Sequence, residues 1–142
     1  MKQKIITYGI VACLTITLFA NCSKTNTPET IASVQQKIKG NWQVVRETLI
    51  EVALPYTKSS SKDGSASDYY NFTADSVFVS SSTIPSIRVS YKVISPNQID
   101  FYLPMSPSIT TKIQTLTNSN CILYFKKGND SVYTVLKVEL KK

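Results

Sequence analysis

The sequence predicts an all-β domain, an eight-stranded antiparallel up-and-down barrel preceded by one short N-terminal helix. From residue 41 onward, apolar and polar residues alternate at a period of two, as in Val89, Tyr91 and Val93, which is typical of strands with one buried face. Turn-forming residues interrupt this pattern at short, regular intervals, as they do in an antiparallel meander. Eight such strands are expected to close into a barrel, because closure removes the exposed edges of a flat sheet.

The first segment, residues 1–21, is typical of an export signal that is removed after transport. Lys2 and Lys4 give it a positive start, and the uncharged run from Ile5 to Ala20 follows. This run has 16 residues, fewer than the roughly 20 apolar residues that a membrane-spanning helix needs. We therefore expect cleavage and not a permanent membrane span.

The end of this segment, Leu18 to Cys22, resembles a lipobox, in which a cysteine thiol takes a diacylglyceryl group before cleavage on its N-terminal side. Phe19 and Asn21 stand where Leu and a small residue are usual. The resemblance implies a lipid on Cys22 that anchors the chain to a membrane, with residues 22–27 as a tether. The alternative is an ordinary secretory signal with an incidental cysteine.

The mature chain is expected to be one domain, residues 28–142, and it opens with a helix at Pro28–Lys39. Thr27 and Pro28 suit the N-cap and the first helical position, and Gly40 ends the pattern. The face expected to be buried consists of Ile31, Val34 and Ile38.

The eight strands follow this helix, separated by polar breaks. The longest break, Ser59–Asp68, is interpreted as a loop. The strands are expected at Trp42–Val52, Tyr69–Phe72, Val77–Ser81, Ile87–Ile94, Gln98–Leu103, Ile109–Leu116, Cys121–Lys127 and Ser131–Leu140. Their clearest inward positions are Ile87, Val89, Tyr91, Val93, Ile99, Phe101, Leu103, Leu136 and Val138.

The composition argues against an enzyme, a metalloprotein and a nucleic-acid-binding protein. The chain contains no histidine and three cysteines, and of these only Cys121 belongs to the barrel, in an apolar segment where burial is expected. The usual zinc sites and His-dependent nucleophiles cannot be built from these residues. Sixteen basic and nine acidic residues give a net charge of +7, but the lysines are scattered and form no nucleic-acid motif. We expect no catalytic residue, no metal and no cofactor.

Gly40 and Trp42 form a Gly-x-Trp motif, which resembles the motif that opens the first strand of lipocalins. The chain from Ile31 to Lys142 is similar in layout to the lipocalin-like domains of small lipoproteins of Gram-negative bacteria. This resemblance implies a Trp42 buried at the closed end of the barrel, beneath the helix. In lipocalins an arginine from the last strand packs across this tryptophan. This chain departs from that pattern, and the nearest basic residues are Lys137 and Lys141.

Two functions follow from this resemblance, and they depend on whether the barrel is hollow or filled. A hollow barrel would bind a small apolar or amphipathic ligand. The aromatic residues expected to line it are Tyr70, Phe72, Tyr91, Phe101 and Tyr124. A packed barrel would instead serve as a structural module or bind an envelope protein. In both cases we expect a non-enzymatic protein of the bacterial cell envelope, at the outer membrane facing the periplasm, because Ser23 and Lys24 begin no acidic export signal.

Two tripeptides, Asp75-Ser76-Val77 and Asp130-Ser131-Val132, look like sites that some Gram-negative bacteria glycosylate on the hydroxyl. Both lie at expected turns. The alternative is ordinary turn chemistry, in which the Asp side chains accept backbone hydrogen bonds.

Overall fold

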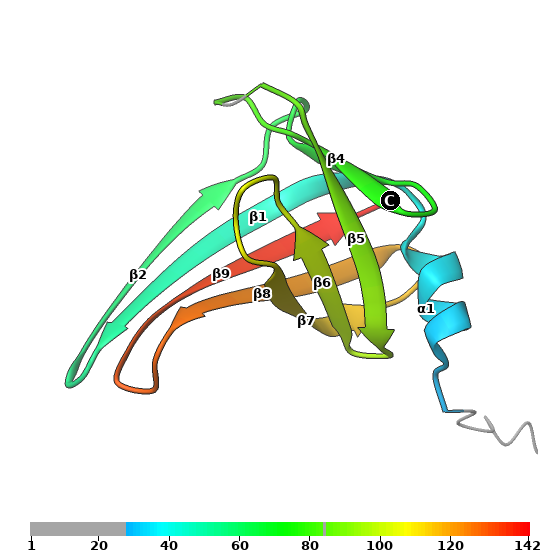
Figure 1. Cartoon of the computed structure of the whole chain (residues 1–142). Coiled ribbons are helices and arrows are strands. Elements are labelled where there is room, and N and C mark those ends of the chain that lie inside the picture. Colours follow the sequence, from blue (N-terminus) through cyan, green and yellow to red (C-terminus); the bar gives the residue numbers. More distant parts are fainter. Residues whose placement is uncertain (1–27, 84) are drawn as a thin grey trace, which may run out of the picture.

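The computed structural model describes residues 28–83 and 85–142. Within these residues the chain forms one helix and nine strands (Figure 1). They are α1 (Ile31–Ile38), β1 (Gly40–Ala53), β2 (Tyr56–Asp63), β3 (Tyr69–Phe72), β4 (Ser76–Ser80), β5 (Ile87–Ser95), β6 (Gln98–Tyr102), β7 (Ile109–Leu116), β8 (Asn120–Gly128) and β9 (Val132–Lys141). The expected export signal, Cys22 and the tether of residues 22–27 lie outside the described residues.

Eight of these strands form a closed antiparallel barrel, which confirms the predicted fold class. Strands β3 to β9 follow one another around the sheet, and β1 pairs with both β3 and β9 to close it. Each of the eight predicted segments coincides with one barrel strand, with ends that differ by at most two residues. No helix in the described ranges is long and apolar enough to cross a membrane.

The helix is shorter than predicted, because Thr30 and not Thr27 caps it. The Thr30 hydroxyl accepts a hydrogen bond from the Ser33 backbone N–H at 3.2 Å, which satisfies one of the free donors at the helix start. Helix α1 therefore begins at Ile31, and Pro28 precedes it. Its Val34 and Ile38 are fully buried.

A ninth strand, β2, lies where the sequence suggested a loop. All eight of its residues are exposed, so it has no buried face and no alternation of apolar and polar residues. It is a strand because its backbone pairs with the second half of β1, from Arg46 to Ala53. The two strands form a long ribbon that extends away from the barrel together with β9 (Figure 1).

An irregularity in β1 changes which of its side chains face inward. The register with β9 shifts between Val44 and Arg46, and Val45, the extra residue, is 46% exposed while Val44 is 3% exposed. A bulge of this kind re-aims the residues that follow it. Before the bulge Trp42 and Val44 point into the barrel, and after it Glu47 takes the inward position, opposite Val138.

The closed end of the barrel is built around Trp42, which is fully buried as predicted. Its indole Nε1–H donates to the carbonyl of Ile38 at 2.6 Å, at the end of α1. The basic residue over its ring is Lys142. It is neither of the two nearest basic residues of the predicted last strand, Lys137 and Lys141. Lys137 lies instead on the outer face of β9, where it forms an ion pair with Glu139 at 2.7 Å.

The barrel interior next to this end is filled by apolar side chains. Cys121 is fully buried among them, as predicted, and burial raises the pKa of its thiol to about 12. Aromatic rings pack edge to face or tilted along the interior: Phe72 lies 5.3 Å from Tyr91, Tyr91 lies 6.3 Å from Phe101 and Phe101 lies 5.6 Å from Phe125. This row of rings leads from the closed end to the opposite, open end.

Candidate functional site

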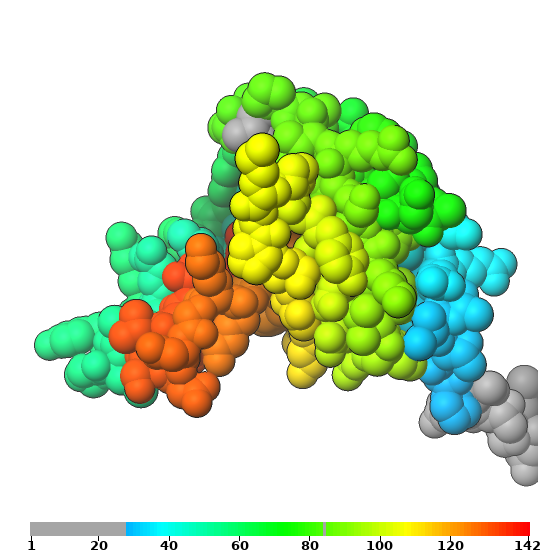
Figure 2. All heavy atoms as spheres, viewed as in Figure 1, coloured from blue at the N-terminus to red at the C-terminus, as the bar shows by residue number. Residues whose placement is uncertain are grey.

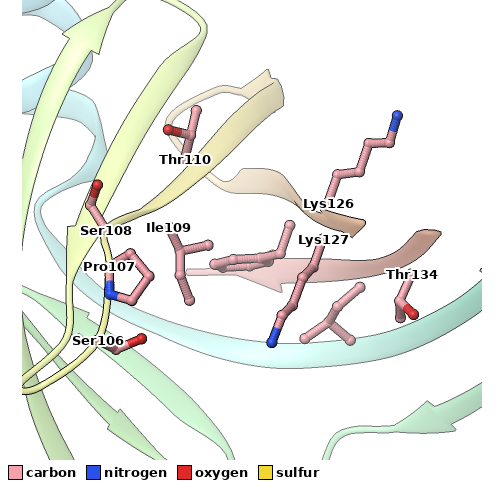
Figure 3. Close-up of a pocket in the computed structure, with 10 residues that line it drawn as sticks. Ser106, Pro107, Ser108, Ile109, Thr110, Lys126, Lys127 and Thr134 are labelled. Atoms are coloured by element: carbon pink, nitrogen blue, oxygen red, sulfur yellow. The ribbon is translucent and has the colours of Figure 1, made fainter. Parts of the chain in front are cut away.

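A groove of about 650 Å³ opens at the end of the barrel away from Trp42. Its walls are the loop between β6 and β7 and the hairpin of β8 and β9, which stand apart as the yellow and orange to red segments of Figure 2. We call it the mouth groove and define it by Ser106–Thr110, Phe125–Lys127, Thr134 and Leu136 (Figure 3). Its volume lies within the range of about 300 to 1,000 Å³ that is typical of small-molecule sites.

A smaller apolar hollow, the inner recess of about 150 Å³, adjoins the groove on the side of the barrel interior. Ile109 and Phe125 belong to both, so these two side chains form the boundary between them. The other residues of the recess are Tyr70, Val77, Val79, Ile87, Val89, Phe101 and Leu103. Both hollows are open to solvent, and neither is an enclosed cavity.

The apolar floor of the groove follows from the strand register. Leu136 of β9 lies between Phe125 of β8 and Leu49 of β1, and residues directly opposite on antiparallel strands share one face of the sheet. Leu49 occupies this face because of the bulge at Val45, and it remains 37% exposed. The bulge therefore extends the apolar face beyond the barrel, onto the ribbon.

Two further rows border this apolar row on the same face, and each ends in a glutamate of β1. In the row toward the hairpin tip, Thr134 lies between Lys127 and Glu51. In the row toward the barrel, Val138 lies between Leu123 and Glu47. Strand β2 pairs with the other edge of β1, and across this pair Glu51 faces Lys58 and Glu47 faces Lys62. Each glutamate of this face thus has a lysine opposite it.

The interior near the recess contains two polar groups, the hydroxyls of Tyr70 and Thr111. Burial, with a smaller contribution from the Glu47 carboxylate, raises the pKa of Tyr70 above its usual value, so this hydroxyl is neutral. Thr111 of β7 is fully buried, and its Oγ1 has no hydrogen-bond partner among the described residues. Thr111 faces Phe125 across the β7–β8 pair.

The five aromatic residues expected to line a ligand site divide into three groups. Tyr70 and Phe101 line the inner recess. Phe72 and Tyr91 are packed in the core, and the Tyr91 hydroxyl donates to the Thr73 carbonyl at 2.7 Å. Tyr124 lies on the outer face.

The inward position expected for Tyr124 is therefore wrong, and Phe125 takes it. On β8 the inward residues are Cys121 and Leu123, both fully buried, and Tyr124 is out of phase with them. Phe125 is in phase, and this parity could have identified it from the sequence. The loop residues Ser106–Ser108 carry no such signal, because their place at the groove depends on the tertiary fold.

Asp68 joins two loops close to Tyr70. Its carboxylate accepts hydrogen bonds from the backbone N–H groups of Ser65 at 2.7 Å and Ser82 at 2.5 Å. These bonds stabilise the charged form and hold the pKa of Asp68 well below its usual value. Asp68 is 5% exposed, so these hydrogen bonds are largely shielded from solvent. We call this arrangement of Asp68, Ser65 and Ser82 the Asp68 clasp.

The two candidate glycosylation sites differ in accessibility. Ser76 is 1% exposed, and its hydroxyl is hydrogen-bonded to Thr73 Oγ1 at 2.9 Å and to Arg88 Nε at 3.1 Å. The fold leaves no room for a glycan there, which corrects that expectation. The turn is held by a backbone hydrogen bond from Ser76 N–H to Thr73 Oγ1 at 3.2 Å, and the acceptor is therefore not Asp75 as expected. Ser131 is exposed, and its backbone N–H donates to the Asn129 side chain at 3.0 Å.

Neither a cluster of metal ligands nor similarity to a known protein assigns a role to this groove. Over residues 28–83 and 85–142, no three His, Cys, Asp or Glu side chains are grouped so that they could hold a metal ion. No protein-family model, no curated protein and no solved structure is significantly similar to this chain.

Proposed function

We propose that this chain is a lipid-anchored lipoprotein of the bacterial cell envelope whose barrel binds a small apolar or amphipathic molecule in the mouth groove, without catalysis. The observation that carries the proposal is the groove of about 650 Å³ with Ile109, Phe125 and Leu136 as its floor. Apolar surface of this kind on a monomer commonly marks a binding site. The inner recess behind Phe125 lengthens the site and suits a ligand with a narrow apolar part.

The polar rim of the groove supports an amphipathic ligand in particular. Ser106, Ser108 and Thr110 stand on one wall and Thr134 on the other, and their hydroxyls can donate or accept hydrogen bonds. Small-molecule sites commonly combine an apolar lining with a few such groups, which fix the orientation of the ligand.

A second candidate function, a protein-interaction module, is favoured by strand β2. This strand pairs with β1 on one side only, and all eight of its residues are exposed. A free strand edge can accept an extended segment of another protein as an additional strand. The filled interior at the closed end of the barrel is compatible with this alternative.

The ligand proposal is tested by filling the groove. In the purified domain from Ser23 onward, which contains the whole barrel, Thr134→Trp places a large side chain on the groove face of β9. We expect it to weaken binding of the neutral fluorescent probe N-phenyl-1-naphthylamine at least tenfold. The control is Tyr133→Trp, which puts the same side chain at the neighbouring position on the opposite face and should leave probe binding unchanged.

Equal probe binding by wild type, Thr134→Trp and Tyr133→Trp would show that the probe does not use the groove. Absence of probe binding by the wild type, together with capture of an extended peptide by β2, would favour the interaction module.

The anchoring proposal rests on the sequence from Met1 to Cys22 and needs its own test. In the full chain expressed in a Gram-negative bacterium, Cys22→Ala removes the thiol that would take the lipid. We expect the variant to leave the membrane fraction and to lack the added mass of the acyl groups. Unchanged membrane association and unchanged mass would contradict lipidation at Cys22.

A further inference from the structure

We infer that the mouth groove prefers single-chain amphiphiles with an anionic head group, and that Lys127 is the residue that recognises the charge. This inference rests on the proposed function, ligand binding in the groove, and adds the chemical class of the ligand. Three observations carry it: the position of Lys127, the absence of a competing carboxylate and the order of apolar and polar rows on the sheet.

Lys127 lies at the rim of the groove, on the face of β8 that lines it. It is in phase with Phe125, and its partner across β9 is Thr134, which also lines the groove. Figure 3 shows the Lys127 side chain on the opposite side of the strand from that of Lys126. The Lys127 ammonium is therefore available to a molecule that lies on the floor of the groove.

The charges around the groove leave Lys127 without a counterion. No residue that lines the groove is acidic. Lys126 has partners of its own, since its ammonium lies 4.0 Å from the Asp130 carboxylate and 4.4 Å from the centroid of the Tyr133 ring. For Lys127, the described residues provide no carboxylate within salt-bridge distance.

The acidic residue that shares the Lys127 row is Glu51, which lies two strands away across Thr134. Adjacent strands are about 4.8 Å apart, so this separation is about 10 Å. Glu51 also has Lys58 directly opposite it on β2. A cation at the rim with no nearby anion favours a negatively charged ligand group and disfavours a positively charged one.

The order of the rows sets the orientation of the ligand. The apolar tail would lie over Phe125 and Leu136 and enter the inner recess, which is too small for more than one chain at about 150 Å³. The head group would then lie one row further toward the hairpin tip, between Lys127 and the Thr134 hydroxyl. A carboxylate or phosphate head can accept hydrogen bonds from both of these side chains.

The test compares two probes with the same tail and opposite head charge, decanoate and decyltrimethylammonium. Binding to the domain from Ser23 onward is measured by calorimetry at low salt, with both probes monomeric. We expect decanoate to bind about threefold to tenfold more tightly, with the difference shrinking at high salt because the site is exposed. Lys127→Glu should remove or reverse this preference.

The matched control is Lys112→Glu, which makes the same change in net charge on the outer face of β7 and should leave the preference unchanged. Equal affinity for the two probes, or the same preference in wild type and Lys127→Glu, would overturn the inference while ligand binding itself stands. Absence of binding by both probes and by the neutral probe would instead remove the proposed function. Binding to phosphatidylglycerol vesicles without binding to monomeric decanoate would also overturn the inference, because the partner would then be a bilayer surface.

Discussion

The ammonium of Lys142 lies 4.5 Å from the centroid of the Trp42 ring, at the end of the barrel away from the mouth groove. The same ammonium donates to the Lys37 carbonyl at 2.9 Å, and the Trp42 indole donates to the neighbouring Ile38 carbonyl. The last carbonyls of a helix lack partners within the helix, so these two side chains cap the end of α1. They thereby join the helix, the start of β1 and the residue after β9.

Replacement of Trp42 by alanine is expected to be strongly destabilising. The side chain is fully buried, and loss of such a tryptophan typically costs about 3 to 5 kcal/mol in the free energy of unfolding. Denaturant unfolding of the domain measures this loss. A value below about 1 kcal/mol would mean that Trp42 does not support the closed end.

Replacement of Lys142 by alanine is expected to lower the free energy of unfolding by about 1 kcal/mol, because it removes a cation–π contact and one helix-capping hydrogen bond. The matched control is Lys141→Ala, at the neighbouring exposed position, which should change stability by less than about 0.5 kcal/mol. If the two variants lose the same amount, the contact between Lys142 and Trp42 contributes nothing measurable.

The sequence predicted the barrel well, because eight strands with one buried face carry a period of two. It also predicted the burial of Trp42, but it failed to identify the lysine above the ring. Lys137 and Lys141 are out of phase with the inward residues Val138 and Leu140. Lys142 is in phase with Val138 and Leu140, so the alternation along β9 could have identified it, although it lies one residue beyond the end of the strand.

Two features beside the candidate site could not be predicted, because neither has a local signal. Strand β2 has no buried face, and its polar residues therefore resembled a loop. The bulge at Val45 changes the phase of β1 and brings Leu49 beside Leu136. The sequence alone gives no position for such a bulge, so the continuation of the apolar row from Leu136 to Leu49 became visible only in the structure.

The Asp68 clasp is expected to make stability depend on pH in the acid range. Hydrogen bonds from the Ser65 and Ser82 backbone lower the pKa of Asp68 in the folded state, whereas an aspartate in the unfolded chain has a pKa of about 3.9. Its contribution is therefore present above about pH 4 and is lost as the pH falls below that value. Asp68→Asn should lower stability at pH 7 and reduce the further loss between about pH 4 and pH 2.

The control for the clasp is Asp63→Asn, which removes an exposed carboxylate paired with Arg46 at 2.9 Å. Exposed pairs contribute little to stability, so this variant should follow the wild-type pH profile. The expectation for Asp68 fails if Asp68→Asn and wild type lose the same stability on acidification.

Replacement of Thr111 by valine is expected to stabilise the domain. Thr111 is fully buried on the inner face of β7, and its Oγ1 has no partner in the described part of the chain. A buried hydroxyl without a hydrogen bond costs about 1 to 3 kcal/mol. Valine has nearly the same shape and no polar atom, so we expect the free energy of unfolding to rise by about 1 kcal/mol.

The matched control for Thr111 is Thr110→Val, at the neighbouring position on the outer face of β7, where the hydroxyl donates to Asp100 at 2.9 Å. Because this bond is exposed, its loss should change stability by less than about 0.5 kcal/mol. Urea unfolding of the three proteins measures both effects.

A loss of stability in Thr111→Val would mean that the hydroxyl is hydrogen-bonded in solution. Its partner would then be a water molecule inside the barrel, since the surrounding protein groups offer none. That outcome would change the view of the interior, because a water beside Phe125 would place a polar site at the boundary between the mouth groove and the inner recess.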